Sequence, residues 1–333
     1  TFSGLTVPNG SLTVQSGSLT LNGTTTIPAG VTLGITGGTL TNNGSLNILG
    51  TFSDTGGTFD GTGALTSSGS VSLGGGTFTN AITNTGSVTV ASGATFTQLF
   101  PNQGTFDLPS GTATFSNGFT QNGGTVNLGS SIASPGSITV GGSGFNLVSG
   151  TVSGSGTITG NVSIGSGTLN PGYSPGALTI AGNLILSATS ATKIEIDGPT
   201  PGTAGVTYDY VNVLGSATLA GTLNVVGFGA YAASAPPAGS SFSFMSFGSS
   251  SGGFGTVNLP APWGINLVAG ATGLQLVMPG QTFLSPAPPP TTSAFDSGLQ
   301  QSMDLLAGLA EKASTNTIAV PNASDDQELK QCR

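Results

Sequence analysis

The stretch GSLTVQSGSLTLNG, Gly10–Gly23, contains one short phrase of sequence twice, as GSLTV and then as GSLTL. In each copy an aliphatic residue alternates with serine or threonine, which predicts a β-strand with one buried and one wet face. Glycine and asparagine flank the copies and supply the positive φ angles that tight corners require. The stretch therefore predicts short strands joined by tight turns.

The same phrase, glycine followed by a hydroxyl residue and an alternating triplet, returns along most of the chain at intervals of about 20 residues. Its clearest later copies begin at Gly44, Gly86, Gly104, Gly124, Gly136, Gly176 and Gly221. One copy cannot bury its apolar side alone, whereas coils stacked on one another share a continuous core. The repeat predicts an all-β protein with regular β-solenoid coils over residues 1–187.

An aromatic ladder is expected inside these coils. The phenylalanines that should stack there are Phe52, Phe59, Phe78, Phe96, Phe106 and Phe115. The composition agrees with this fold, because 57 glycines in 333 residues exclude a helical protein. They follow no strict three-residue period, which excludes collagen, and 36% hydrophobic residues argue against disorder.

Charge is scarce and uneven. Charged residues make up 5% of the chain, the net charge is −8, and the first basic residue is Lys193. Four basic residues cannot neutralise a phosphate backbone, so nucleic acid and anionic lipid are poor partners. No apolar run reaches the ~18 residues of a membrane span.

Catalytic chemistry has few candidate residues. The chain has no histidine, and its single cysteine, Cys332, excludes an intrachain disulfide and a cysteine-rich metal site. The only acids before Lys193 are Asp54, Asp60 and Asp107. We therefore predict no catalytic, cofactor-binding or metal-binding residues, and a protein that is not an enzyme.

One acidic cluster deserves a structural test. It consists of Glu195, Asp197 and Asp209. A carboxylate cluster can serve general acid–base chemistry or metal binding, but we favour a solvated face.

The regular repeat pattern ends after residue 187. Residues 188–278 are predicted to form a less regular β-rich continuation or closing section. Proline density predicts a semi-rigid linker over 279–293. Near-helical apolar spacing and a capping box predict an amphipathic helix over 294–313, before a polar tail over 314–333.

Three segments carry a family resemblance: GTLNPGYSPGALTIAGNLIL (Gly167–Leu186), KIEIDG (Lys193–Gly198) and YDYVNVLGSATLAGTLNV (Tyr208–Val225). They resemble the C-terminal passenger repeats of bacterial autotransporter and filamentous-haemagglutinin-like surface adhesins. The resemblance implies a right-handed parallel β-helix that is secreted by Gram-negative bacteria to the cell surface or the extracellular space.

The ends of a solenoid expose unpaired strand edges, which favours self-assembly. We predict a head-to-tail homopolymer, an extracellular filament with adhesion, matrix or biofilm roles, in which residues 294–320 cross into the neighbouring copy. The residues expected at this interface are Phe2, Leu5, Val7, Phe295, Leu299, Met303, Leu306, Ile318 and Val320. Surface glycans and neighbouring cells are further partners to consider.

Other functions stay open at this point. The first is a monomeric adhesin stalk that binds surfaces or glycans, and another is a polysaccharide-degrading β-helix enzyme. A third is ice binding, suggested by Thr-x-Thr at residues 77–79, 95–97, 112–114 and 157–159. Ice binding needs a flat face in strict register, and the unequal coil lengths argue against one.

Overall fold

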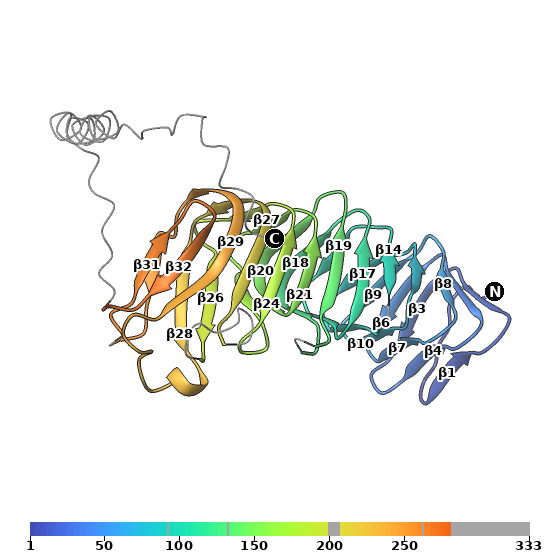
Figure 1. The fold of residues 1–333 in the computed structure, drawn as a ribbon. Coiled ribbons are helices and arrows are strands. Elements are labelled where there is room, and N and C mark those ends of the chain that lie inside the picture. Colours follow the sequence, from blue (N-terminus) through green and yellow to red (C-terminus); the bar gives the residue numbers. More distant parts are fainter. Residues whose placement is uncertain (92, 132, 199–206, 262, 281–333) are drawn as a thin grey trace, which may run out of the picture. The chain divides into compact units, whose positions relative to one another are not determined.

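The structure is a computed structural model that describes residues 1–91, 93–131, 133–198, 207–261 and 263–280. In these ranges the chain is all-β and forms a parallel β-solenoid, which confirms the fold class predicted from the repeats (Figure 1). The helical content of the described residues is one 3-10 turn, η1 (Gly229–Tyr231). None of the helices described there is long and apolar enough to span a membrane.

Each regular coil contributes three strands, which pair with the matching strands of the neighbouring coils and so build three parallel faces. The first face contains β1 (Ser11–Val14), β4 (Thr32–Ile35), β7 (Thr51–Asp54), β10 (Ser70–Leu73), β13 (Ser87–Val90), β16 (Thr105–Leu108), the second halves of β18 (Phe119–Leu128) and β20 (Phe145–Gly154), β23 (Thr168–Pro171), β26 (Ala191–Ile196), β28 (Thr222–Gly227) and β30 (Thr256–Asn258).

The second face contains β2 (Ser18–Leu21), β5 (Thr39–Asn42), β8 (Thr58–Asp60), β11 (Gly76–Phe78), β14 (Ala94–Phe96), β17 (Gly111–Phe115), β19 (Gly136–Val140), β21 (Gly156–Thr159), β24 (Ala177–Ala181) and the first halves of β27 (Tyr210–Leu219) and β29 (Ser241–Gly252). Strands β2, β5 and β8 form a separate sheet, so the hydrogen-bonded ladder of this face is interrupted between β8 and β11.

The third face contains β3 (Thr24–Ile27), β6 (Ser45–Ile48), β9 (Ala64–Ser67), β12 (Ala81–Asn84), β15 (Phe100–Asn102), the first halves of β18 and β20, β22 (Val162–Ile164), β25 (Leu184–Leu186) and the second halves of β27 and β29. A hairpin of β31 (Asn266–Ala269) and β32 (Gly273–Val277) follows, and β32 pairs antiparallel with the first half of β29.

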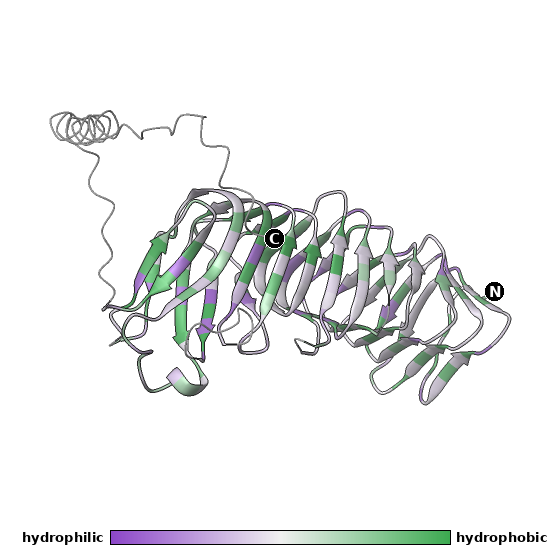
Figure 2. Cartoon of the chain, viewed as in Figure 1, coloured by the Kyte–Doolittle hydropathy of each residue, from purple (hydrophilic) through white to green (hydrophobic). Residues whose placement is uncertain are grey.

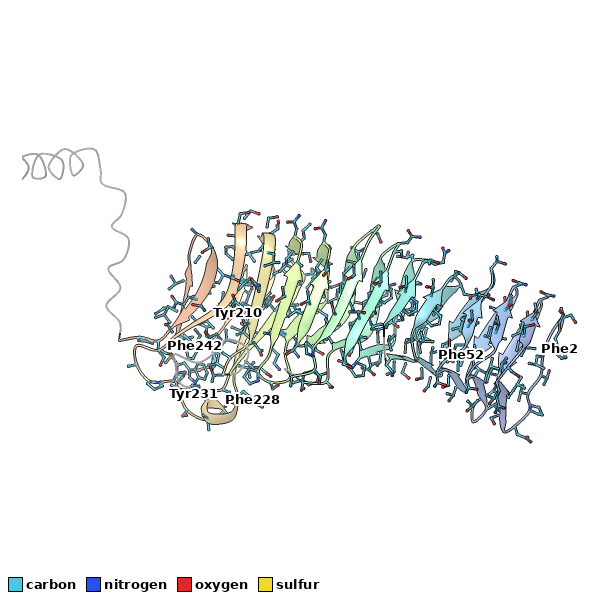
Figure 3. All side chains as sticks on the ribbon, turned by 45° about the vertical axis from the view of Figure 1, so that its right-hand side comes forward. Phe2, Phe52, Tyr210, Phe228, Tyr231 and Phe242 are labelled. Atoms are coloured by element: carbon cyan, nitrogen blue, oxygen red, sulfur yellow. The ribbon has the colours of Figure 1, made fainter. Side chains whose placement is uncertain are left out.

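The core lies between the three faces. Buried and more exposed residues alternate along the strands, and Figure 2 shows the alternation as green and pale bands. The six phenylalanines expected inside are all buried, Phe52 among them (Figure 3), but they occupy two faces instead of one ladder. On the second face, the ring centroids of Phe78 and Phe115 lie 5.2 and 4.8 Å from that of Phe96.

Sequence analysis missed a second aromatic stack on the third face. The ring centroid of Phe119 lies 5.6 Å from that of Phe100 and 5.1 Å from that of Phe145. The two stacks meet edge to face, with 5.0 Å between the centroids of Phe96 and Phe100. Stacked and edge-to-face ring pairs at such distances are favourable beyond their buried area.

Polar side chains at the inner corners form a ladder of their own. The Asn84 amide donates to Asn102 Oδ1 at 2.6 Å, and the Asn102 amide donates to Gln121 Oε1 at 2.6 Å. Each of the three also donates to a backbone carbonyl near its corner, such as that of Gly104. Buried amides are tolerated here because they satisfy backbone groups that the turns leave unpaired.

Three of the glycines that precede first-face strands have a steric cause. Gly69, Gly86 and Gly104 precede first-face strands in successive coils and stack directly on one another. A Cβ added at Gly86 would lie 2.1 Å from the carbonyl oxygen of Gly69, and one at Gly104 would lie 1.9 Å from that of Gly86. Any side chain at these corners would push neighbouring coils apart and break the hydrogen bonds between them.

We therefore predict that Gly86→Ala lowers the free energy of unfolding by about 3 kcal/mol or more, through steric overlap with backbone that cannot retreat. Gly253→Ala is the matched control, because a Cβ there meets no atom within 4 Å. Its cost should stay below about 1 kcal/mol. Denaturant unfolding followed by circular dichroism measures both values, and equal costs for the two variants would contradict the stacking explanation.

Candidate functional site

The first rung contains three of the residues that sequence analysis assigned to self-assembly. Phe2 forms a parallel bridge with Leu21, and its N–H donates to the Thr20 carbonyl at 2.9 Å. Its side chain is 48% exposed, while Leu5 and Val7 pack on the core and are partly buried. Among the described residues β1 pairs with β4 alone. Figure 3 shows Phe2 at the N-terminal end of the stack.

The remaining predicted assembly residues lie outside the described residues. They are Phe295, Leu299, Met303, Leu306, Ile318 and Val320. The predicted helix over 294–313 and the tail over 314–333 fall in the same range.

The last rung is covered on one face and open on another. The β31–β32 hairpin covers the second-face half of β29. Near the end of β28, Tyr231 packs edge to face against Trp263 with 6.2 Å between ring centroids. On the first face, β30 pairs with β28 alone among the described residues. The two ends of the stack are therefore different in structure.

The acidic cluster is only partly assembled. Asp209 is fully buried, and its two carboxylate oxygens each accept a backbone N–H at 2.8 Å, one from Gly176 and one from Glu195. The Glu195 carboxylate pairs with Lys193. Asp197 instead accepts the N–H of Ala230 at 2.7 Å.

The expectation of a solvated face is wrong for this cluster, because Glu195 is 5% exposed and Asp209 is not exposed at all. Their carboxylates are engaged by backbone N–H groups and by Lys193, which ties the turn at Gly176 to β26. In the part of the chain that the structure describes, no three His, Cys, Asp or Glu side chains gather as a metal site would require. The cluster supports the fold.

Burial raises the pKa of Asp209 to about 7, against the pull of its backbone hydrogen bonds. Between its ordinary pKa of 3.8 and 7, the folded state holds a proton here that the unfolded chain has released. The contribution of Asp209 to stability is therefore full below 3.8 and is lost as the pH rises towards 7.

We predict that Asp209→Asn removes the part of the stability loss between about pH 4 and 7 that comes from deprotonation of Asp209. Between about pH 4 and 7 the melting temperature of the variant should rise relative to that of the wild type, because asparagine does not titrate. Thermal melts by circular dichroism across this range test the difference. Two parallel pH profiles would show that Asp209 is ionised throughout.

The outer surface carries hydroxyl columns in strict register. On the first face, one residue per coil from Ser11 to Thr168 is a serine or threonine, and each pairs with its neighbour directly. On the second face, Thr95, Thr114 and Thr139 are in register with one another. The Thr-x-Thr motifs at residues 95–97 and 112–114 are offset by two residues, because Thr95 pairs with Thr114. These motifs therefore do not form one face in strict register, as expected from the unequal coil lengths.

Two of the clefts on the described surface contain a carboxylate. One, of about 730 Å³, lies beside the interruption between β8 and β11, and Asp60 is its charged residue. The other, of about 340 Å³, lies on the first face and contains the side chains of Thr89, Asp107 and Asn127, which occupy successive coils. Tyr173 lines this second cleft and is 46% exposed.

Tyr173 reaches the cleft from the turn after β23. Its hydroxyl donates to the Gly129 carbonyl, beside the end of β18. The turn is fixed at both ends, because the Gly172 N–H donates to the Gly154 carbonyl at 2.7 Å and the Gly176 N–H donates to Asp209. Burial and the nearby Asp107 carboxylate raise the pKa of the tyrosine.

Sequence analysis did not single out Tyr173 as a functional residue. Its signal was present in the sequence, since it is a lone aromatic within the turn segment Pro171–Gly176, which is rich in glycine and proline. Its proximity to Asp107 could not be read from the sequence, because the two residues are several coils apart.

Compared with protein-family models and with curated proteins, the chain matches none. Its function is therefore argued from the geometry described above.

Proposed function

We propose that this protein is a non-enzymatic structural subunit of a secreted, extracellular filament, in which solenoids stack head to tail. One observation carries the proposal. Among the residues that the structure describes, the first-face strands at the two ends of the stack, β1 and β30, each pair with a neighbour on one side only. Unpaired strand edges are templates for pairing with another chain.

The polarity of the stack supports a head-to-tail arrangement. The pairings between first-face strands are parallel from β1 to β30, so β1 of one copy would continue the ladder after β30 of another in the same sense. The β31–β32 hairpin confines this contact, because it covers the neighbouring second face of the last rung. The preference of parallel crossover connections for one hand supports a right-handed winding, as the resemblance implies.

The neutral side faces support a structural role. Hydroxyl columns keep the surface hydrated without charge. The neighbouring acids Glu195 and Asp209 are buried and already bound by Lys193 and by backbone N–H groups, which does not favour their use as the paired acids of a glycosidase. A location outside the cell is supported by the resemblance of residues 167–225 to secreted adhesin repeats. The absence of lysine and arginine before Lys193 would also limit tryptic cleavage there.

The second candidate is a monomeric adhesin stalk. The observation that favours it is the same hairpin, since β31 and β32 close part of the last rung as a terminal cap would. Negative-stain electron microscopy of the purified protein distinguishes periodic filaments from isolated particles.

Two changes test the filament. Deleting Thr282–Arg333 should leave folded monomers that do not polymerise, if the predicted arm crosses into a neighbouring copy. Phe2→Lys should also reduce assembly, because it places a charge on the half-exposed edge of the first rung.

Val148→Lys is the matched control, since Val148 is a 49% exposed apolar residue of β20, in the middle of the stack. It should assemble as the wild type does. Sedimentation and electron microscopy measure the outcome for all three variants. Filaments that survive the deletion would exclude the arm, and filaments that survive Phe2→Lys would exclude the first rung as an interface.

A further inference from the structure

We propose that the cleft between Tyr173 and Asp107 binds a neutral sugar unit of a polysaccharide or glycan chain. This site lies on the first face, several coils from either end of the stack. It would therefore remain available in a filament and in a monomer alike, and the inference does not depend on the proposed assembly.

The Tyr173 ring supplies a stacking platform. Nearly half of the side chain is exposed, although its hydroxyl is anchored to the Gly129 carbonyl. The turn that carries it is closed on itself, since a Cβ on Gly176 would lie 2.0 Å from the Gly172 Cα. Ser174 in the same turn has a positive φ of 53°, which is uncommon outside glycine and marks a fixed conformation. An aromatic ring held in place in this way binds with little loss of conformational entropy.

Polar groups opposite the ring match the hydroxyls of a sugar. Asp107 Oδ1 accepts from the Asn127 amide at 2.5 Å, and Asn127 Oδ1 accepts from the Ser153 hydroxyl at 2.8 Å. The second oxygen of Asp107, Oδ2, has no protein donor within the described ranges. It can accept a charge-assisted hydrogen bond from a ligand hydroxyl.

Other lining groups complete the match. Thr89 and Ser130 add hydroxyls that both donate and accept, and Pro109 adds apolar surface. The volume of about 340 Å³ is at the small end of ligand sites, which fits one or two sugar rings of a longer chain.

Other ligands fit the cleft less well. A hard cation such as Ca²⁺ takes six to eight oxygens, whereas Asp107 is the single carboxylate of the lining. A quaternary or lysine ammonium group is held best by several aromatic rings, and Tyr173 is the one aromatic in the lining. Asp107 would repel phosphates and uronic acids, so the cleft should select neutral sugars over acidic ones.

The test is isothermal titration of the full chain with a panel of neutral oligosaccharides: cellohexaose, chitohexaose, mannohexaose and a β-1,4-galactan hexamer. A galacturonate hexamer serves as the acidic counterpart, with CaCl₂ and a lysine-rich peptide as the alternative ligands. We expect at least one neutral hexamer to bind with a Kd below about 1 mM, and the galacturonate hexamer to bind at least about tenfold more weakly.

Variants assign the binding to this cleft. Tyr173→Ala should weaken it about tenfold or more, whereas Tyr173→Phe, which keeps the ring, should stay within about threefold. Asp107→Asn should weaken binding of the neutral hexamer. It should also reduce the ratio of the affinity for the neutral hexamer to the affinity for the galacturonate hexamer. Melting curves check that each variant folds, and if Tyr173→Ala does not, Asp107→Asn carries the assignment.

Two controls place a similar change elsewhere. Phe228→Ala removes another exposed aromatic, and Asp60→Asn neutralises the carboxylate of the other cleft. Both should bind as the wild type does. The proposal would be overturned if no neutral hexamer binds, if only CaCl₂ or the basic peptide binds, or if Asp107→Asn leaves affinity and selectivity unchanged.

Discussion

The fold depends on close backbone contact at the stacked glycine corners. Where Gly86 lies on Gly69, and Gly104 on Gly86, there is no room for a Cβ, and this contact sets the distance at which neighbouring coils can share hydrogen bonds. The alternating strands between the corners then need only place apolar residues inwards. Coil length is free to vary because the extra residues bulge at the corners, and the faces keep their register.

Polar groups inside the solenoid serve the same corners. Asn84, Asn102 and Gln121 hydrogen-bond one another and also the turns beside them. Buried Asp54 accepts the N–H groups of Gly56 and Gly57. Asp209 accepts the N–H of Gly176, in a turn of the neighbouring coil. In this protein, which has few charged residues, several carboxyl groups therefore accept hydrogen bonds from backbone N–H groups.

Much of the fold could be predicted from the sequence because the repeat is local. Gly10–Gly23 already contains the strand period, the turn residues and the coil corner. The division of the phenylalanines among faces could not be predicted, since it depends on where in each coil a residue falls after corners of variable length. The burial of Asp209 and the proximity of Tyr173 to Asp107 depend in the same way on contacts between coils. For the predicted assembly residues, the sequence pattern identified partly exposed Phe2 at the first rung, but it carried no signal of the closing hairpin.

The cleft beside Tyr173 has a consequence for the order of events during folding. The floor of the cleft is formed by Thr89, Asp107 and Asn127, whereas its aromatic wall belongs to the turn that follows β23, later in the chain. That turn is in turn secured by Asp209, which comes later still in the chain. A chain wound only as far as Asn127 would present the floor without the wall, so occupancy of this cleft would distinguish finished molecules from those still being wound.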